Sequence, residues 1–251
     1  MDKKDLILGK NALREAFAAE IRIQKIFISE TLDKEDTKEL LKLAHQHKVP
    51  ILKVAKQKLD RLSRSNHQGV IGLNSAIPFY QSQSLVDNIL FHGKNPALCV
   101  CDGITDVRNF GAIARSAEIF GLHGIIIPQK DSAPVNSESI KASSGALLSL
   151  PVCREKNLVH SLKQFKKMGL SILCASEKAD KNIRDLDLNK SIAIVLGSEG
   201  TGVSREVLNE ADELAKIPQI GSIASLNVSV AAGIFFYEWM LQNQNEPKER
   251  K

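Results

Sequence analysis

Three short segments gather small and polar residues where an apolar, strand-like run ends, and their residue types could do chemistry. The first segment covers residues 102–115 and leads into a helical pattern. Within it, Asn109 is a natural N-cap and Asp106 is well placed near the positive end of the helix. If the helix begins at Gly111, Arg115 lies one turn further along, on the face above Gly111. A capped helix with a surface arginine would also explain this segment.

The second segment, residues 196–204, places three glycines within six residues directly after a strongly apolar run. Glycines free the backbone for tight turns and for the close approach of a ligand. The segment superficially resembles a nucleotide-binding glycine loop, but it lacks the G-x-G-x-x-G order and the lysine of a P-loop. Glu199 in its middle would repel a phosphate and suits a ligand with hydroxyls, amines or a positive centre. The alternative is a cluster of turn glycines without a ligand.

The third segment, residues 217–233, begins where a predicted strand ends at Pro218 and continues as a loop of small residues. A helix is expected to begin around Leu226, with Ser225 as the candidate cap. The small residues of 231–233 permit close helix packing. Capping and packing alone would explain this segment, so a function for it stays an alternative at this point.

Other chemistry-bearing patterns are missing. The chain contains neither a G-x-S-x-G nucleophile elbow nor an H-E-x-x-H motif, and its six histidines show no metal-ligand spacing. These observations argue against hydrolases and metalloenzymes, and the missing Rossmann fingerprint argues against a dinucleotide-dependent oxidoreductase. The four cysteines fall inside apolar runs, which indicates reduced, buried thiols; Cys99 and Cys101 have the wrong spacing for a redox or zinc pair.

The elements that must position these segments alternate between strands and helices. In the second half, strands are expected at 97–101, 124–127, 171–175, 192–196 and 213–217, and helices at 111–120, 158–168, 204–211 and 226–241. The continuous apolar run at 192–196 favours a parallel sheet covered on both faces. The first 76 residues alternate in the same way and predict a small α/β domain.

We therefore expect two α/β domains. The predicted boundaries are a front domain over 1–76, a linker over 77–96 with a brief helix around 85–91, a second domain over 97–245 and a flexible tail over 246–251. No stretch approaches the roughly 20 apolar residues of a membrane helix. The charged start has no long apolar run behind it, which makes a secretory signal unexpected and favours a cytoplasmic protein.

The formal net charge of +5 is unevenly distributed. All of the excess lies between Lys48 and Arg64, where six basic residues face the single acid Asp60. A concentrated basic patch is the electrostatic footprint of a nucleic-acid contact. The candidate RNA-binding residues are Lys53, Lys56, Lys58, Arg61, Arg64 and the neighbouring His67. A solvated helix with surface lysines is the alternative.

Taken together, the three segments resemble the motifs of the SpoU (TrmH) family of RNA ribose 2′-O-methyltransferases. They read D-x-R-N-x-G-A-I-x-R, I-V-L-G-S-E-G-x-G-V-S and I-P-x-x-G-x-x-x-S-L-N-V-S-V-A-A-G, in the family's order. The front domain, with the run Ser65–Val70, looks like that family's substrate-binding domain, which is related to the L30e fold. One departure is Val107, where many members have proline; we expect a small backbone difference there and no loss of chemistry.

The resemblance implies an α/β architecture, with a C-terminal trefoil-knot (SPOUT) methyltransferase domain behind the small L30e-like α/β domain. It further implies a homodimer that uses S-adenosyl-L-methionine and no metal. By the same resemblance, the cofactor pocket is built by Leu196, Gly197, Gly200, Ile217, Pro218 and Leu226, with Ser144 and Gly145 nearby. The implied catalytic residues are Asn109, Arg115, Glu199, Ser225 and Asn227.

The implied reaction is displacement at a sulfonium methyl group by a ribose 2′-hydroxyl. Arg115 would stabilise developing alkoxide charge and grip the adjacent phosphate, since a guanidinium is an awkward general base; base action stays an open alternative. Asn109, Ser225 and Asn227 would orient Arg115 and the ribose, and Glu199 would hold the loop or Arg115.

The two-domain layout resembles the ribosomal branch of the family, which implies a guanosine of 23S rRNA, free or in an assembling large subunit, as the target. The alternatives are a tRNA guanosine 2′-O-methyltransferase, an antibiotic-resistance rRNA methylase of the same family, and a non-catalytic RNA-binding member. The presence of all five implied catalytic residues speaks against the non-catalytic alternative.

Overall fold

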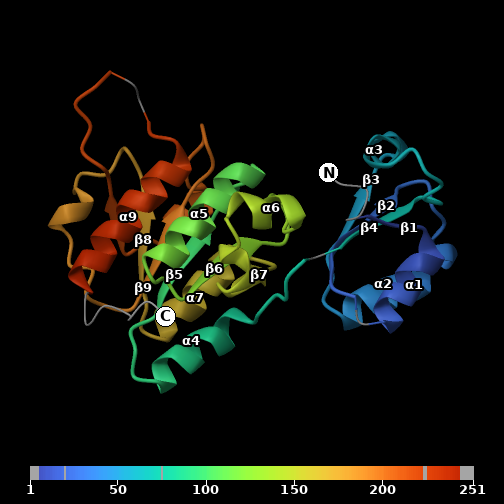
Figure 1. Ribbon diagram of the computed structural model, residues 1–251, viewed down its shortest axis with the longest axis horizontal. Coiled ribbons are helices and arrows are strands. Elements are labelled where there is room, and N and C mark those ends of the chain that lie inside the picture. Colours follow the sequence, from blue (N-terminus) through green and yellow to red (C-terminus); the bar gives the residue numbers. More distant parts are fainter. Residues whose placement is uncertain (1–5, 20, 75, 223–224, 244–251) are drawn as a thin grey trace. The chain divides into compact units, whose positions relative to one another are not determined.

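The computed structural model describes residues 6–243 except 20, 75, 223 and 224, and the side chains of 34–36 are not described. The chain divides into two compact units (Figure 1). The first comprises the residues up to Pro78 together with Pro134–Glu138, and the second comprises Phe79–Ala133 and the chain from Ser139 onward. The predicted tail 246–251 lies outside the described residues.

The first unit is built on a four-stranded mixed sheet in the order β1-β4-β2-β3. Strand β2 pairs parallel with β3 and antiparallel with β4, which pairs antiparallel with β1. The strands are β1 (Leu6–Leu8), β2 (Ile23–Ser29), β3 (Ile51–Val54) and β4 (Val70–Asn74), and the helices are α1 (Lys10–Ala18), α2 (Lys34–Gln46) and α3 (Lys56–Leu62).

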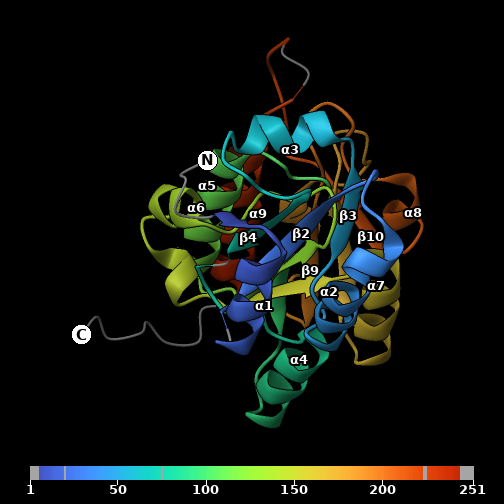
Figure 2. The ribbon, with the colours of Figure 1, turned by 90° about the vertical axis from the view of Figure 1, so that its right-hand side faces the viewer.

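Alternate side chains of β2 divide the core of this unit into two layers. Ile26 and Ile28 are buried with the apolar sides of α1 and α2, whereas Phe27 is buried with Leu59 of α3. Because neighbouring strand residues point to opposite faces, α1 and α2 cover one face of the sheet and α3 covers the other (Figure 2). The predicted small α/β domain is thus present, with the addition of the short strand β1.

The second unit is built on a six-stranded, all-parallel sheet in the order β10-β8-β9-β5-β6-β7. The strands are β5 (Ala97–Cys101), β6 (Gly124–Pro128), β7 (Val152–Glu155), β8 (Ser171–Ala175), β9 (Ile192–Leu196) and β10 (Glu213–Ala215). Strands β5 and β9 are buried along their whole length, which is why they read as unbroken apolar runs.

Helices cover this sheet. They are α4 (Ser82–Phe91), α5 (Val107–Ile119), α6 (Ser137–Ala142), α7 (Leu158–Lys167), α8 (Arg205–Leu208) and α9 (Val228–Gln242), with short 3-10 turns at Ala146–Leu148 and Ile183–Asp185. One core cluster joins α4, α7 and α8 to Leu98 and Val100 of β5. Helices α5 and α9 pack against each other (Figure 1). Within the described part of the chain, no helix is long and apolar enough to cross a membrane.

Two expectations about the chain's organisation need correction. Residues 79–96, which we expected to be linker, belong to the second unit: Val86 of α4 is fully buried in its core, and Tyr80 pairs with Cys153 beside β7. Helix α5 begins at Val107, earlier than the expected start at Gly111. Helix α9 begins at Val228, later than the expected start at Leu226. The reason is that other side chains act as their caps.

Candidate active site

The three motif segments follow β5, β9 and β10 of one parallel sheet, so all three leave the sheet at the same edge. Cys101 of β5 pairs with Leu196 of β9, and β8 lies between β9 and β10. Two hydrogen bonds of Asp102 tie the first segment to the second: its backbone N–H donates to Leu196 O at 2.8 Å, and its carboxylate accepts from Ser204 N–H at 2.7 Å. The glycine loop between these two points is therefore anchored at both ends to the same aspartate.

Helix α5 is capped by Asp106, not by Asn109. The Asp106 carboxylate accepts the backbone N–H groups of Arg108 and Asn109 at 2.9 and 2.8 Å. This arrangement places Val107 at the first helical position, where proline is favoured because its missing N–H costs nothing. A valine can take that place without moving the helix, and the Asn109 side chain is left available for another partner.

Helix α9 is capped by Asn227, not by Ser225. The Asn227 side-chain oxygen accepts from the backbone N–H and the hydroxyl of Ser229 at 2.9 and 2.6 Å. Its amide nitrogen is therefore free of the cap and donates to Glu199 and Asn109. Ser225 is exposed in the preceding loop, two residues before the cap.

The carboxylate of Glu199 joins the amino-terminal ends of both helices. Its Oε1 accepts from the amide of Asn109 at 2.9 Å and from the amide of Asn227 at 2.7 Å, and the Asn227 amide also donates to Asn109 Oδ1 at 3.0 Å. A negative charge at two positive helix ends is electrostatically favourable, and charge-assisted bonds are stronger than neutral ones. Asn109, Glu199 and Asn227 thus form one hydrogen-bonded cluster, which we call the Glu199 cluster.

The glycine loop folds back on itself beside this cluster. Ser198 and Gly202 exchange backbone hydrogen bonds at 3.1 and 3.0 Å, and the hydroxyls of Ser198 and Thr201 lie 2.5 Å apart. Gly197 packs so closely that a Cβ there would lie 2.0 Å from the backbone carbon of Gly202. Gly200, at φ +92°, adopts a conformation that other residues avoid. These two positions require glycine for different reasons.

A cavity of about 290 Å³ opens between the motif loops. Eight of the predicted site residues line it: Leu196, Gly197, Glu199, Gly200, Ile217, Ser225, Leu226 and Asn227. Its wall combines apolar side chains with backbone and a few polar groups, which is the usual composition of a small-molecule pocket.

Four predicted site residues do not line the cavity. Pro218 lies exposed between two lining residues, and Asn109 reaches the site through the Glu199 cluster. Ser144 is exposed after α6 and is not among the residues that line the cavity. Arg115 is exposed on α5, six positions and therefore about 240° around the helix from Asn109.

Asn109, Asn227 and Glu199 were expected to orient Arg115, but they form hydrogen bonds with one another instead. Among the described residues, none of these three side chains forms a hydrogen bond with the Arg115 guanidinium. The cluster instead holds the glycine loop, which was the other role expected for Glu199.

One wall of the cavity was not predicted from the sequence. Ala175, Ser176 and Glu177 follow β8 and line it, as do Val228, Ala231 and Phe235 of α9. The strand run 171–175 carried the signal for the first group, because ligands in open parallel sheets bind outside the carboxyl ends of adjacent strands.

Of the six predicted RNA-binding residues of the first unit, five are exposed cations and the sixth, His67, is buried. Lys53 on β3, Lys56, Lys58 and Arg61 on α3, and Arg64 beyond it are all exposed. Lys58 also lies over the Phe27 ring, 5.8 Å from its centroid. Within the described residues, no group of three or more histidine, cysteine or acidic side chains is arranged to hold a metal ion.

His67 does not belong to that exposed surface. Its side chain is 7% exposed; Nδ1 accepts from Gly69 N–H at 3.1 Å, and Nε2 lies 3.0 Å from the Asp60 carboxylate. Since Nδ1 accepts, Nε2 carries the proton and donates to Asp60. The prediction that His67 faces RNA is therefore corrected: both ring nitrogens are used within the fold.

The fold and the site together define an α/β methyltransferase of the SPOUT type. Residues 96–237 match the model of the SpoU rRNA Methylase family, and residues 6–78 match the model named RNA 2'-O ribose methyltransferase substrate binding. The chain belongs to the SpoU methylase family. The resemblance seen in the motifs and the predicted fold class, a trefoil-knot methyltransferase domain behind a small α/β substrate-binding domain, are thereby confirmed.

Curated relatives carry names of the same kind. The chain is 33% identical over 234 residues to the "Putative TrmH family tRNA/rRNA methyltransferase YacO" of Bacillus subtilis, covering 93% of this chain and 94% of the relative. A "Putative TrmH family tRNA/rRNA methyltransferase" of Staphylococcus saprophyticus is 35% identical over 233 residues, with the same coverage of 93% and 94%.

Solved structures share the fold. The SpoU methyltransferase AviRb from Streptomyces viridochromogenes, crystallised with AdoMet, has a TM-score of 0.58 at 24% identity and covers 94% of this chain and 89% of its own. An AdoMet-bound rRNA methyltransferase from Sinorhizobium meliloti has a TM-score of 0.57 at 22% identity, with coverage of 93% and 85%. A TrmH/SpoU tRNA modifying enzyme of A. aeolicus has a TM-score of 0.55 at 27% identity and covers only 63% of this chain and 84% of its own.

Proposed function

We propose that this protein transfers the methyl group of S-adenosylmethionine to a ribose 2′-hydroxyl of RNA, with a guanosine of 23S rRNA as the target. The observation that carries the proposal is the Glu199 cluster beside the cavity, because it organises all three family motifs around one space. The family and the structural neighbours crystallised with AdoMet support the same reaction.

The residues that line the cavity suit this cofactor. Leu196, Ile217, Leu226 and Phe235 offer apolar contacts to an adenine ring, and the exposed loop backbone offers hydrogen-bonding groups. Glu177 and Glu199 are carboxylates on its wall, which favour a positively charged ligand. When bound, S-adenosylmethionine supplies an electrophilic methyl group on a positively charged sulfur.

The residues of the chain would contribute to catalysis by positioning the reacting groups and by stabilising developing charge. Asn109 and Asn227 hold Glu199, and through it the loop that contains Gly197 and Gly200. Arg115 would stabilise charge that develops on the ribose oxygen and hold the neighbouring phosphate. Holding the reacting groups in line supplies up to about 7–11 kcal/mol of the barrier in favourable cases.

Arg115→Ala tests this assignment. The variant should lose methyl transfer from labelled S-adenosylmethionine to total RNA, while calorimetry should find the affinity for S-adenosylmethionine within about twofold of wild type. The control is Arg184→Ala, an exposed arginine of the second unit outside the three motifs, which should retain activity. If the variant lost cofactor binding together with activity, the assignment of Arg115 to the catalytic step would be contradicted.

The front unit is proposed to grip the RNA through α3 and its flanks. Reversing the charges of Lys53, Lys56 and Lys58 should weaken RNA binding in a filter assay and flatten its salt dependence, because phosphate contacts release counterions. Unchanged affinity would contradict this docking surface.

A tRNA guanosine is the second candidate substrate, since the curated relatives are named tRNA/rRNA methyltransferases. The two-unit layout favours rRNA: the S. meliloti rRNA methyltransferase covers 93% of this chain, whereas the A. aeolicus tRNA modifying enzyme covers 63%. Mapping the methylated nucleotide after incubation with total RNA decides between them.

We also propose a cytoplasmic homodimer. Helix α9 is apolar on nearly all sides, yet only Ala232, Phe235, Phe236 and Trp239 are buried. Val230, Tyr237 and Leu241 form an exposed stripe on its outer side, and Ile119 of α5 is 61% exposed. An all-apolar helix is expected to be covered. Light scattering should give the mass of two chains, and Tyr237→Lys should shift it toward one.

A further inference from the structure

Asp102 does not line the cavity, yet it holds the glycine loop of residues 196–204 at both ends. It follows β5 directly, and its backbone N–H donates to Leu196 O at 2.8 Å, which continues the pairing of β5 with β9 by one residue. Its carboxylate accepts the backbone N–H of Ser204 at 2.7 Å. The first and the last residue of the loop are therefore joined through one residue that lies outside it.

The backbone at Ser204 requires an acceptor of this kind. Ser204 precedes α8, and its own side chain forms no capping bond with that helix. Val203, one residue earlier, is buried in the core of the second unit. A backbone N–H beside the core costs free energy if it has no acceptor, and a charged acceptor forms a stronger hydrogen bond than a neutral one. Burial thus fixes the side chain of Val203, and Asp102 fixes the backbone of Ser204.

The residues that follow Asp102 contact the rest of the same loop. A Cβ added to Gly103 would lie 3.4 Å from the Cβ of Ser198, which is van der Waals contact. Further along, the Asn109 amide donates to the Glu199 carboxylate in the turn of the loop. The first motif segment therefore holds the second one at its beginning, in its turn and at its end.

The shape of this loop determines the shape of the cavity. All of residues 196–200 and Gly202 line it. A ligand binds more weakly to a site that adopts its competent shape only part of the time, because the apparent affinity falls with the fraction of molecules in that shape. A restraint on the loop from outside the cavity, such as the Asp102 carboxylate, therefore changes the affinity for whatever the cavity holds.

We infer that Asp102 is a positioning residue for S-adenosylmethionine: its carboxylate keeps the glycine loop in the binding shape before the cofactor enters. This inference rests on the proposed function, which places that cofactor in the cavity. The two restraints on the loop then have different roles. Asp102 governs the affinity for the cofactor, whereas the Glu199 cluster, which joins the loop to α5 and α9, governs the transfer step.

Two substitutions of Asp102 in the full-length protein test this role. Asp102→Ala removes the acceptor, whereas in Asp102→Asn the side-chain oxygen can still accept the Ser204 N–H as a neutral group. The matched control is Asp187→Ala. Asp187 is exposed and does not line the cavity, and its carboxylate likewise accepts a backbone N–H, that of Asn189 at 3.0 Å.

Three measurements are made on each variant. Calorimetry gives the affinity for S-adenosylmethionine. Methyl transfer to total RNA gives kcat and the KM for the cofactor. Hydrogen exchange of the cofactor-free protein gives the protection of residues 198–204, which a change in global stability alone would not alter more than that of β5 and β9.

We expect Asp102→Ala to bind S-adenosylmethionine about tenfold more weakly and to raise its KM by a similar factor. At saturating cofactor, kcat should stay within about twofold of wild type, because the cofactor then holds the loop itself. The amides of 198–204 should exchange faster than in wild type. Asp102→Asn should recover an affinity within about threefold of wild type. Asp187→Ala should match wild type in cofactor affinity and in exchange of the loop.

Ser204→Pro removes the donor and keeps the carboxylate. The φ of Ser204 is −61°, which proline can adopt. Alone, this substitution should weaken cofactor binding about as much as Asp102→Ala does. In the double variant it should add little, because both changes remove the same hydrogen bond. Additive losses of affinity would mean that the two residues act separately and would overturn the inference.

The remaining outcomes are also decisive. Unchanged affinity and loop exchange in Asp102→Ala would overturn the role of Asp102, and so would a lower kcat at unchanged affinity. If the wild type binds S-adenosylmethionine but methylates no RNA, the proposed substrate fails, while calorimetry and hydrogen exchange still decide the role of Asp102. If the wild type does not bind S-adenosylmethionine, the proposed function and this inference fail together.

Discussion

The side-chain amide of Asn227 lies 2.7 Å from the carboxylate of Glu199, while the oxygen of the same asparagine caps helix α9. One side chain therefore fixes both where the helix begins and where the glycine loop rests. Because the cap and the loop contact use opposite ends of the amide, only asparagine satisfies both without rearrangement. Aspartate would cap the helix equally well but would place a second negative charge against Glu199.

Asn227→Ala should lower both the unfolding free energy and the rate of methyl transfer, and the two losses can be measured separately. Loss of the cap is expected to cost about 1 kcal/mol of unfolding free energy. Loss of the contacts to Glu199 and Asn109 should lower methyl transfer by roughly tenfold to hundredfold, since the loop is no longer held. Urea unfolding and a methyl-transfer assay measure the two effects.

The control for that variant is Asn157→Ala, which removes the cap of α7 away from the cavity. It should lose a similar unfolding free energy and keep its activity. If both variants lost activity in parallel, the effect would be one of stability alone.

Gly197→Ala should abolish cofactor binding. A methyl group at this position would overlap the backbone of Gly202 and Val203, at 2.0 and 2.1 Å, so the loop itself must move. We expect a destabilisation of about 1–3 kcal/mol and no measurable heat of S-adenosylmethionine binding in calorimetry. Gly221→Ala, where nothing lies within 4 Å of the added Cβ, should leave the unfolding free energy unchanged. Normal cofactor affinity in Gly197→Ala would contradict the assigned role of this loop.

His67→Ala should destabilise the first unit. The substitution leaves the Gly69 N–H without its acceptor and Asp60 without its donor, which is expected to cost about 1–3 kcal/mol. Urea unfolding monitors the loss, and exposed His160→Ala should stay within about 0.5 kcal/mol of wild type. A variant with unchanged stability and weaker RNA binding would restore the original interpretation of His67 as an RNA contact.

The cysteines should resist modification in the folded protein. Burial raises the pKa of the Cys153 and Cys174 thiols to about 12, with nearby carboxylates adding to the effect, and burial also raises the pKa of Cys99 well above its usual value. At pH 8 the reactive thiolate of Cys153 is then on the order of one part in ten thousand. Ellman's reagent should find four thiols in guanidinium and none, over minutes, in the native protein.

The same shifts fix a pH dependence of stability. Between the ordinary thiol pKa and about 12, the unfolded chain has lost protons that the folded chain keeps. Unfolding free energy should therefore be unaffected by these groups below about pH 8 and fall as the pH rises from about 9 toward 12. Rapid thiol labelling at pH 8 without unfolding would contradict both expectations.

Local patterns along the sequence predicted β5, β6, β8, β9 and β10 but missed the edge strand β7. Strands β5 and β9 were the clearest, because they are covered on both faces and leave an unbroken apolar run. The same patterns also located the three loops of the site. The caps were wrong for a physical reason: Asp106, Asn109, Ser225 and Asn227 can all cap a helix, and the choice between them depends on Glu199, which is distant in sequence.

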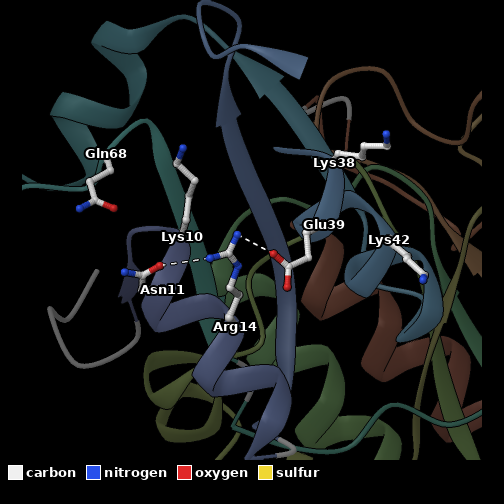
Figure 3. A pocket seen from close by; sticks show the side chains of 7 residues that line it. All are labelled: Lys10, Asn11, Arg14, Lys38, Glu39, Lys42 and Gln68. Atoms are coloured by element: carbon white, nitrogen blue, oxygen red, sulfur yellow. Dashed lines mark hydrogen bonds and ion pairs between the residues drawn. The ribbon is translucent and has the colours of Figure 1, made fainter. Parts of the chain in front are cut away.

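Side-chain contacts between distant segments could not be predicted in this way. The burial of His67 depends on Asp60 and Gly69 closing around it, and the ion pair of Arg14 with Glu39 joins α1 to α2 (Figure 3). For His67 a count of charges along the chain is misleading, because a residue beside a basic segment can be buried.

The Glu199 cluster also has a consequence for the protein's synthesis. Asn109 and Asn227 are 118 residues apart, and the Asn227 cap exists only when α9, the last helix described, has formed. Chains emerge from the ribosome amino-terminus first, so the first unit can fold while the cluster is still missing its final member. A nascent chain in which α9 has not yet formed therefore lacks the assembled site for the methyl donor.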